Sequence, residues 1–313
     1  MSRTFRIDNF PPVPLPVLHF FRISEANLKR QPAGFLVYYP QNNKEGDTMK
    51  KLTWLLVILA LLLALGLGFH RQLRNLWVEL TFPLTEHSET EWKVKEYADS
   101  RDISYAEYPE SLIALLERNP ETEDFVLNYP FRQSWDGNMS GFSRDTVPLM
   151  LQWDTRWGYQ KYGSDLLAIT GCGPTSLAMA GYYLTGDPAF NPGTVAEFSR
   201  KNGYYASGYG SSWTLISEGG PKLGLEVTEL PLVKKKILSA LEAGNPVILA
   251  MGPGDFTTSG HYIVLTGVED GAFRVNDPNS TANSGRLWTY EELEGQIRNI
   301  WSIGKQDSGN QPQ

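Results

Sequence analysis

The sequence predicts an α+β domain over residues 147–305, preceded by a single membrane-spanning helix. The first observation is an apolar helical run that Gly173-Pro174 opens and that continues to about Leu184. The second is a set of apolar segments of strand length that come later in the chain, at residues 246–251, 262–268 and 272–276. The third is an uncharged stretch, Leu52–Phe69, near the N-terminus. Because early helices are followed by later strands, the α+β class is predicted.

The Leu52–Phe69 stretch is long and apolar enough to cross a bilayer. Its 18 residues carry no charge, and as a helix they would measure about 27 Å, close to the thickness of the hydrocarbon core. A buried core helix would normally show a polar face, and here only Thr53 is polar. We therefore predict a transmembrane signal-anchor over residues 49–70, with membrane contact through residues 52–69. A cleaved signal peptide is the alternative, for which Ala64-Leu65-Gly66 is a poor cleavage site.

The charges that flank this segment give a small preference for one orientation. Lys44, Lys50 and Lys51 precede it, whereas Arg71 and Arg74 follow it. The side with more positive charge tends to stay in the cytoplasm. We therefore expect a single-pass protein of the cell membrane with its folded domain on the extracytoplasmic side.

The segments on either side of the anchor, and the segment after the domain, lack the apolar patterning that a folded core needs. Residues 1–48 contain Pro-rich PPVPLP, which predicts an extended or disordered arm. Alternatively, Met49 is the true initiator and these residues reflect a mis-assigned start. Residues 71–146 are polar, with a helix expected at Glu110–Arg118, and predict a stalk of short helices that dock on the following domain. Residues 306–313 are expected to form a disordered tail.

Composition excludes several classes of protein. Of the 313 residues, 41% are hydrophobic and 20% are charged, which argues against a collagen-like or wholly disordered chain. The single cysteine excludes an internal disulfide, and it excludes zinc or iron–sulfur sites built on several thiols. The net charge is −7 and the longest basic run is Lys234-Lys235-Lys236, so nucleic acid is not an expected partner.

Further elements of the domain follow from local signals. Helices are expected at Val195–Lys201 and Val233–Ala243. The last two strand segments are joined by Glu269-Asp270-Gly271, a hairpin turn with glycine at a position that needs positive φ. Pro174 suits the first turn of the helix that begins beside it.

Cys172 is the candidate nucleophile. It stands between Gly171 and Gly173 at the start of the apolar helical run. Unpaired backbone N–H groups and the dipole at a helix start favour a thiolate. The flanking glycines would leave the sulfur open and let a substrate backbone lie close. A buried structural cysteine is the alternative, but it would need neither flanking glycines nor a helix start.

A nucleophilic thiol needs a base, and His261 is the one histidine of the four that lies in the predicted domain. It opens an apolar strand after the flexible Thr258-Ser259-Gly260. The hairpin that follows returns the chain to Asp277, whose carboxylate is a candidate to orient the imidazole. The alternatives are a satisfied core or surface histidine and, for Asp277, a turn residue before proline.

Acyl transfer through a thiolate also needs donors for the oxyanion that develops on the substrate. The backbone N–H of Cys172 can supply one. Gln152 is a candidate for a second, although from the residues alone a solvated glutamine is the better interpretation.

Three motifs together resemble a known family. They are VPLMLQWDTRWGYQKYG, TGCGPTSLAMAGYYLTG and GHYIVLTGVEDGAFRVNDP, in this order between Val147 and Lys305. They resemble the cysteine peptidase family 39-like group, relatives of the domain that removes double-glycine leaders from bacteriocins.

The resemblance implies a papain-like fold, with the nucleophile helix packed on an antiparallel sheet. It also implies that Cys172 is the nucleophile, His261 the general base, Asp277 the orienting carboxylate and Gln152 the oxyanion-hole amide. Two features depart from the family. The sequence contains no GxxxxGK[ST] motif of an ATP-binding transporter domain, which puts a leader-peptide substrate in doubt. The 20-residue interval from Gln152 to Cys172 is longer than in papain.

The predicted protein is a membrane-anchored thiol peptidase or amidase that forms an acyl-enzyme on Cys172 and requires no cofactor or metal. Its expected substrate is a peptide or a cell-wall peptide. Two alternatives stay open. An acyltransferase could use the same triad, because the identity of the acceptor does not reside in the triad. A non-catalytic peptide or cell-wall binding module is the other. The sequence does not specify an oligomeric state.

Overall fold

The structure is a computed structural model that describes residues 44–208 and 210–306. Contacts divide the chain within its first helix, between Leu63 and Ala64, into two units. The predicted arm or mis-assigned start over residues 1–43, and the predicted tail over residues 307–313, lie outside the described residues.

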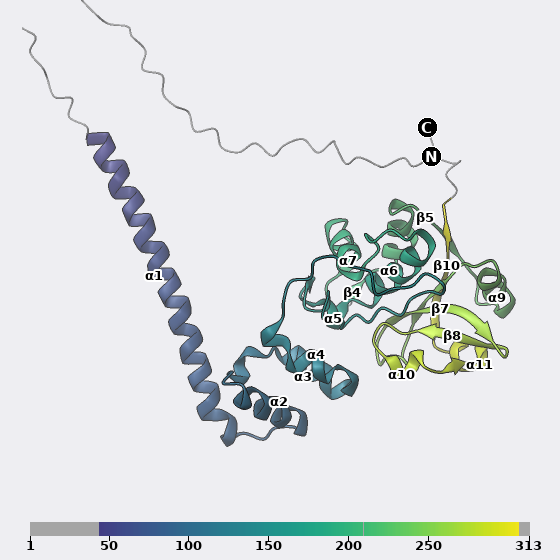
Figure 1. The fold of residues 1–313 in the computed structure, drawn as a ribbon, viewed down its shortest axis with the longest axis horizontal. Helices are drawn as coiled ribbons and strands as arrows, with labels where there is room; N and C mark the ends of the chain where they lie inside the picture. Colours follow the sequence, from purple (N-terminus) through teal and green to yellow (C-terminus); the bar gives the residue numbers. More distant parts are fainter. Residues whose placement is uncertain (1–43, 209, 307–313) are drawn as a thin grey trace, which may run out of the picture. The chain divides into compact units, whose positions relative to one another are not determined.

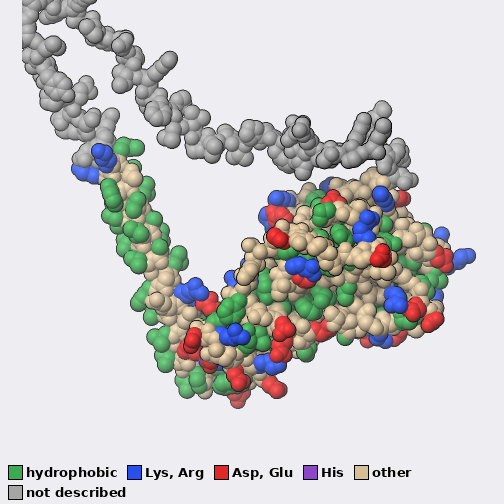
Figure 2. All heavy atoms as spheres, in the orientation of Figure 1, with side chains coloured by type: hydrophobic (Ala, Val, Ile, Leu, Met, Phe, Trp, Pro, Cys, Tyr) green, Lys and Arg blue, Asp and Glu red, His purple; other side chains and the backbone are tan. Residues whose placement is uncertain are grey.

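Helix α1 (Lys44–Thr81) carries the apolar stretch (Figure 1). It begins before and ends after the predicted anchor at 49–70, because the polar turns at both ends continue the helical hydrogen bonding. Residues 44–48, which the sequence analysis assigned to the arm, are therefore helical. Every large hydrophobic side chain from Met49 to Phe69 is exposed (Figure 2). The span Met49–Leu84 is long and apolar enough to cross a membrane, and its exposed surface fits a membrane anchor.

Three short helices follow: α2 (Glu89–Ser100), α3 (Glu110–Arg118) and α4 (Glu123–Leu127). Four 3-10 turns flank them, at Phe82–Leu84, Tyr105–Glu107, Pro120–Thr122 and Tyr129–Phe131. We call residues 89–131 the helical segment. Its buried side chains, including Val94, Leu112 and Phe125, share one hydrophobic core with Leu166 and Ala168 of the next domain. The helical segment is therefore packed against the domain rather than separate from it.

Helices are spread along the domain, before and between the strands of its main sheet. These are α5 (Leu167–Thr170), α6 (Cys172–Thr185), α7 (Pro192–Lys201), α8 (Gly220–Lys222), α9 (Lys234–Glu242), α10 (Thr281–Ser284) and α11 (Tyr290–Glu294), with a π-helical turn at Leu215–Gly219. Helix α6 starts at Cys172, slightly earlier than expected. Pro174 lies in its first turn, where a missing backbone N–H breaks no intrahelical hydrogen bond.

A six-stranded antiparallel sheet forms the other half of the domain, in the order β5-β10-β6-β7-β8-β9. Its strands are β5 (Leu225–Glu229), β6 (Val247–Met251), β7 (His261–Glu269), β8 (Ala272–Asn276), β9 (Leu287–Trp288) and β10 (Ile297–Lys305). Two further two-stranded sheets pair β1 (Lys161–Tyr162) with β2 (Asp165–Leu166), and β3 (Tyr205–Ala206) with β4 (Gly210–Ser211). Only β6, β7 and β8 were predicted from the sequence. Strand β10 was not predicted, and its pairing is broken by a register shift between Ile297 and Asn299.

The six-stranded sheet separates two cores. Ile248 and Val264 belong to the core that contains α6, whereas Val247 and Ile263 belong to the core that contains Ile237 of α9. Because both faces are buried, β6 reads as a continuous apolar run rather than an alternating one. Helix α6 packs on β7 and β10. This helix on an antiparallel sheet confirms the predicted α+β class.

The hairpin between β7 and β8 turns through two residues with positive φ, Asp270 (50°) and Gly271 (77°). Positive φ at both central residues is typical of a type I′ turn, whose twist matches that of the strands. The turn lets β8 return beside β7, so that the chain after β8 reaches the start of β7.

Candidate active site

Cys172 is the first residue of α6 and is partly exposed, with Gly171 as the N-cap residue. Cys172 therefore lies at the N-terminus of a 14-residue helix, where the helix dipole favours negative charge at the sulfur. The flanking glycines have a different role from the one expected. A Cβ on Gly173 would lie 2.6 Å from the Cβ of Ser211, and one on Gly171 would lie 2.4 Å from the carbonyl oxygen of Leu167. Protein atoms fill the space beside both, so they allow close packing instead of leaving room for a substrate backbone.

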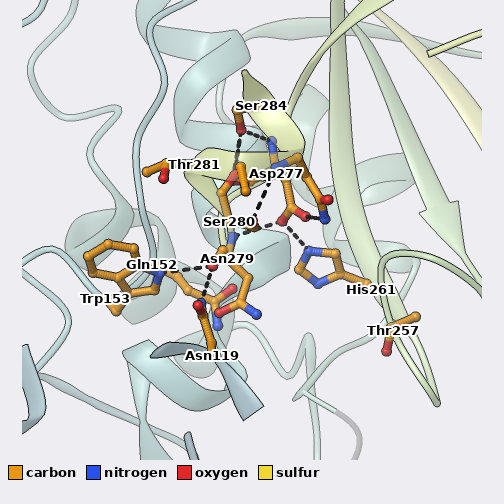
Figure 3. Close-up of polar contacts among 12 residues, drawn as sticks. Asn119, Gln152, Trp153, Thr257, His261, Asp277, Asn279, Ser280, Thr281 and Ser284 are labelled. Carbon is orange, nitrogen blue, oxygen red and sulfur yellow. Dashed lines mark hydrogen bonds and ion pairs between the residues drawn. The ribbon is translucent and has the colours of Figure 1, made fainter. Parts of the chain in front are cut away.

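His261 is the first residue of β7 and pairs with Met251 of β6. Its side chain is buried, and its Nε2 lies 2.7 Å from Oδ1 of Asp277 (Figure 3). Asp277 directly follows β8, and the register of β7 with β8 brings it back to the start of β7. The hairpin therefore brings these two predicted residues together.

The carboxylate of Asp277 is 1% exposed and is held by three donors. Its Oδ1 accepts from His261 Nε2 and from the backbone N–H of Asn279 at 2.8 Å. Its Oδ2 accepts from Nδ2 of Asn283 at 2.8 Å. The backbone N–H of Asp277 donates to the hydroxyl of Ser284 at 2.9 Å (Figure 3). A buried charge needs such partners, and together they fix the direction in which the carboxylate points.

The protonation of His261 is set by these neighbours. Burial alone would lower the pKa of its imidazole, but the charge and hydrogen bond of Asp277, with a smaller contribution from Cys172, outweigh burial and raise the pKa to about 10. Because Nε2 is committed to Asp277, Nδ1 is the ring nitrogen left to interact with Cys172. An imidazole that keeps its proton at neutral pH stabilises a neighbouring thiolate.

Two buried tyrosines, Tyr162 and Tyr262, belong to the core against which Cys172 packs. Burial raises the pKa of both Tyr162 and Tyr262, and the nearby sulfur of Cys172 raises each of them further. The hydroxyl of Tyr262 donates to the carbonyl oxygen of Ser211 at 3.2 Å. Both phenols therefore stay neutral, and Cys172 packs against the hydrophobic core to which they belong.

Gln152 is buried and reaches two parts of the site. Its backbone N–H donates to the carbonyl oxygen of Pro278 at 2.7 Å, next to Asp277. Its side-chain Nε2 donates to the carbonyl oxygen of Ala168 at 2.7 Å, in the short helix α5 that precedes Cys172. Nε2 carries a second hydrogen that this bond does not use. The structure therefore fixes the Gln152 amide near the beginning of α6, and it is not a solvated side chain.

The residues that hold Asp277 were not predicted from the sequence. Asn279 donates its backbone N–H to the aspartate two residues before it, which is an Asx turn. The sequence Asp-Pro-Asn was a signal for this turn, and the turn interpretation of Asp277 is compatible with its contact to His261. No local pattern indicated Asn283. Within residues 44–208 and 210–306, no group of three or more His, Cys, Asp or Glu side chains could hold a metal ion.

Comparisons with known proteins bear on the same part of the chain. The model of the Peptidase_C39-like family matches residues 144–308. No curated protein gives a match. Among solved structures, the peptidase domain of Streptococcus ComA, a bifunctional ABC transporter of a quorum-sensing pathway, is 20% identical. The match covers 44% of this chain and 93% of that domain, with a TM-score of 0.34. A C39-like peptidase from Bacillus anthracis is 16% identical, over 52% of this chain and 96% of the other, with a TM-score of 0.35.

Proposed function

The chain belongs to the Peptidase_C39-like family, whose model covers residues 144–308, and we propose that it is a membrane-anchored cysteine peptidase or amidase. The observation that carries the proposal is the buried pair of His261 and Asp277, 2.7 Å apart, beside a cysteine at a helix start. The raised pKa of His261 supports it, because an imidazolium next to the thiol favours the nucleophilic thiolate.

Acylation begins when the sulfur of Cys172 attacks the carbonyl carbon of a peptide bond. The new C–S bond gives a tetrahedral intermediate with negative charge on the former carbonyl oxygen. When the C–N bond breaks, His261 donates its proton to the leaving amine, and a thioester remains on Cys172. Asp277 keeps the imidazole in the orientation that this transfer requires.

Deacylation reverses these roles. His261, now neutral, accepts a proton from a water molecule whose oxygen attacks the thioester carbon. The C–S bond breaks, the carboxylic acid leaves, and the thiolate and imidazolium are restored. Water is consumed and an acid and an amine are released, so the cycle needs no cofactor.

The oxyanion needs donors near the sulfur. We propose that the backbone N–H of Cys172 and the second Nε2 hydrogen of Gln152 supply them. The hydrogen bond from Gln152 to the carbonyl oxygen of Ala168 supports this role, because it holds the amide without using both hydrogens.

The setting of the domain suggests its substrate. We propose a peptide or cell-wall peptide substrate, met on the extracytoplasmic side of the membrane to which α1 anchors the protein. The exposed apolar surface of α1 and the three lysines before it, against two arginines after it, support this placement.

Peptide cleavage tests the proposal. The full chain in detergent micelles is incubated with a peptide library, and products are identified by mass spectrometry with and without an added primary amine. We expect hydrolysed products from the wild type and none from Cys172→Ala, with equal thermal unfolding temperatures for the two. Cleavage that persists in Cys172→Ala would exclude the thiol mechanism. Products joined to the amine in preference to water would assign the chain to acyl transfer.

A further inference from the structure

We propose that Glu121 and Asn119, in the helical segment between the anchor and the domain, position the loop that carries Asp277. The inference rests on the proposed function and deepens it by naming positioning residues outside the part of the chain that the family model matches, residues 144–308. We call residues 277–284 the aspartate loop.

Glu121 binds the aspartate loop with both carboxylate oxygens. Its Oε1 accepts from the hydroxyl of Ser280 at 2.7 Å and from the backbone N–H of Ala282 at 3.4 Å. Its Oε2 accepts from the backbone N–H of Thr281 at 2.7 Å and from the hydroxyl of the same residue. One carboxylate thus satisfies four donors of a loop that lies about 160 residues further along the chain.

Asn119 holds the same loop one residue closer to Asp277. It is buried, and its Nδ2 donates to the backbone carbonyl of Asn279 at 2.6 Å (Figure 3). That carbonyl also accepts from Nε1 of Trp153 at 3.0 Å. The N–H of Asn279 in turn donates to Oδ1 of Asp277, the oxygen that bonds His261. The backbone of Asn279 therefore links a hydrogen bond from the helical segment to the hydrogen bonds of Asp277 and the imidazole.

The two residues also support each other. The Oδ1 of Asn119 accepts from the backbone N–H of Glu121 at 3.1 Å, which starts the 3-10 turn Pro120–Thr122. Asn119 thereby directs Glu121 toward the aspartate loop while its own amide group holds Asn279. A single turn of the helical segment makes both contacts.

The aspartate loop needs this support because it contains little regular structure. Its helix, α10, has four residues, and apart from that helix it has one isolated bridge, between Asp277 and Ser280. The hydroxyl of Ser284 bonds within the loop, to the carbonyl oxygen of Ser280 at 2.7 Å. Contacts within the loop fix its shape, whereas contacts from the helical segment, together with those from Gln152 and Trp153, fix where it lies.

The helical segment contacts both the part of the chain that precedes Cys172 and the aspartate loop. Its Phe125 lies in one core with Ala168, in the short helix α5 that precedes Cys172. The hydroxyl of Tyr159 donates to the carbonyl oxygen of Phe125 at 2.7 Å, and Ser111 donates to Asp165 at 3.0 Å. The segment therefore contacts the part of the chain that leads to the thiol, and through Glu121 it contacts the part that orients the base.

The charge state of Glu121 suits this role. Burial would raise the pKa of its carboxyl, but the hydrogen bonds from Thr281, Ser280 and the backbone outweigh burial and lower it. A lowered pKa means that the carboxylate is ionised at neutral pH and releases the loop only as the pH falls through that pKa.

Alkylation of Cys172 reports on the triad without a substrate. The probe is iodoacetamide, the sample is the full chain in detergent micelles, and intact mass gives the rate at pH 6 and at pH 9. Because Cys172 is the sole cysteine, every adduct belongs to it. The variant is Glu121→Gln, which can still accept from Ser280 but presents an amide donor to the N–H of Thr281. The matched control is Glu123→Gln, because Glu123 pairs with Lys93 at 2.7 Å and does not contact the loop.

We expect Glu121→Gln to lower the ratio of the pH 6 rate to the pH 9 rate by about tenfold, because a displaced imidazolium stabilises the thiolate of Cys172 less well, and tenfold corresponds to about 1.4 kcal/mol. Glu123→Gln should match the wild type. Thr281→Val, which removes one hydroxyl from the other side of the contact, should give a smaller loss and also serves if Glu121→Gln does not fold.

Wild-type ratios in folded Glu121→Gln, or in Thr281→Val when Glu121→Gln does not fold, would overturn the inference and leave the proposed function standing. A wild type that itself reacts at pH 6 like a free thiol would overturn the proposed function first.

Discussion

Replacing Asp277 by asparagine should separate the charge of the carboxylate from its shape. In the structure Oδ1 accepts from His261 Nε2 and the Asn279 N–H, and Oδ2 accepts from Asn283. In Asp277→Asn the amide oxygen can keep the place of Oδ1, and the Asn283 amide needs only to turn over to accept from the new NH2 group. His261 should therefore keep its position and lose its counter-charge.

The magnitude follows from the contact. A carboxylate this close to a cationic group is worth about 1–3 pKa units, or about 1.4–4 kcal/mol. The pKa of His261 should therefore fall from about 10 to about 7–9. The imidazolium is the proton donor to the leaving amine, so its charged form is needed below the pKa, and activity is lost as the pH rises through it.

The assay is kcat/KM against pH for a peptide that the wild type cleaves. We expect the alkaline limb of the profile to move down by 1–3 units in Asp277→Asn. Asp270→Asn makes the same chemical change at the far end of the hairpin, in a turn where asparagine is well tolerated, and should leave the limb in place. An alkaline limb that is the same in Asp277→Asn and in the wild type would refute the reasoning.

Two further predictions concern the oxyanion and the membrane. Gln152→Ala should lower kcat by roughly 10²–10³-fold through loss of an oxyanion donor. The control is Gln160→Ala, the same change at an exposed glutamine. Equal turnover of Gln152→Ala and wild type would remove Gln152 from the site. Protease added to intact cells should degrade the domain at residues 144–308. A domain that resists the protease until the cells are lysed would instead lie in the cytoplasm.

Much of the domain was predictable because its signals are local. The start of α6 was predicted from Gly173-Pro174, and the β7–β8 hairpin from Asp270-Gly271, since both depend on backbone preferences of adjacent residues. The hairpin also accounts for the meeting of His261 and Asp277, which are 16 residues apart. The glycines beside Cys172 misled the prediction, because sequence shows their flexibility but not that Ser211 and Leu167 fill the space beside them.

The rest depends on contacts between distant residues. Strand β10 lies in the middle of the sheet, but its partners are β5 and β6, and a register shift breaks its pairing. From the sequence alone Gln152 is predicted to be solvated, because its hydrogen-bond partner, the carbonyl of Ala168, is 16 residues away in the chain. Glu121 is one of several acidic residues in a polar stretch before the domain. No residue near it in the sequence indicates its contact with a loop about 160 residues away.

The central claim is that His261 activates Cys172, and the pH dependence of Cys172 alkylation tests it most directly. Free cysteine, with a pKa of about 8.5, is about 200-fold less reactive at pH 6 than at pH 9. We predict that the wild-type full chain reacts with iodoacetamide at pH 6 within about tenfold of its pH 9 rate, and that His261→Ala restores the steep dependence of a free thiol. A wild type with that steep dependence, unchanged in His261→Ala, would contradict the claim.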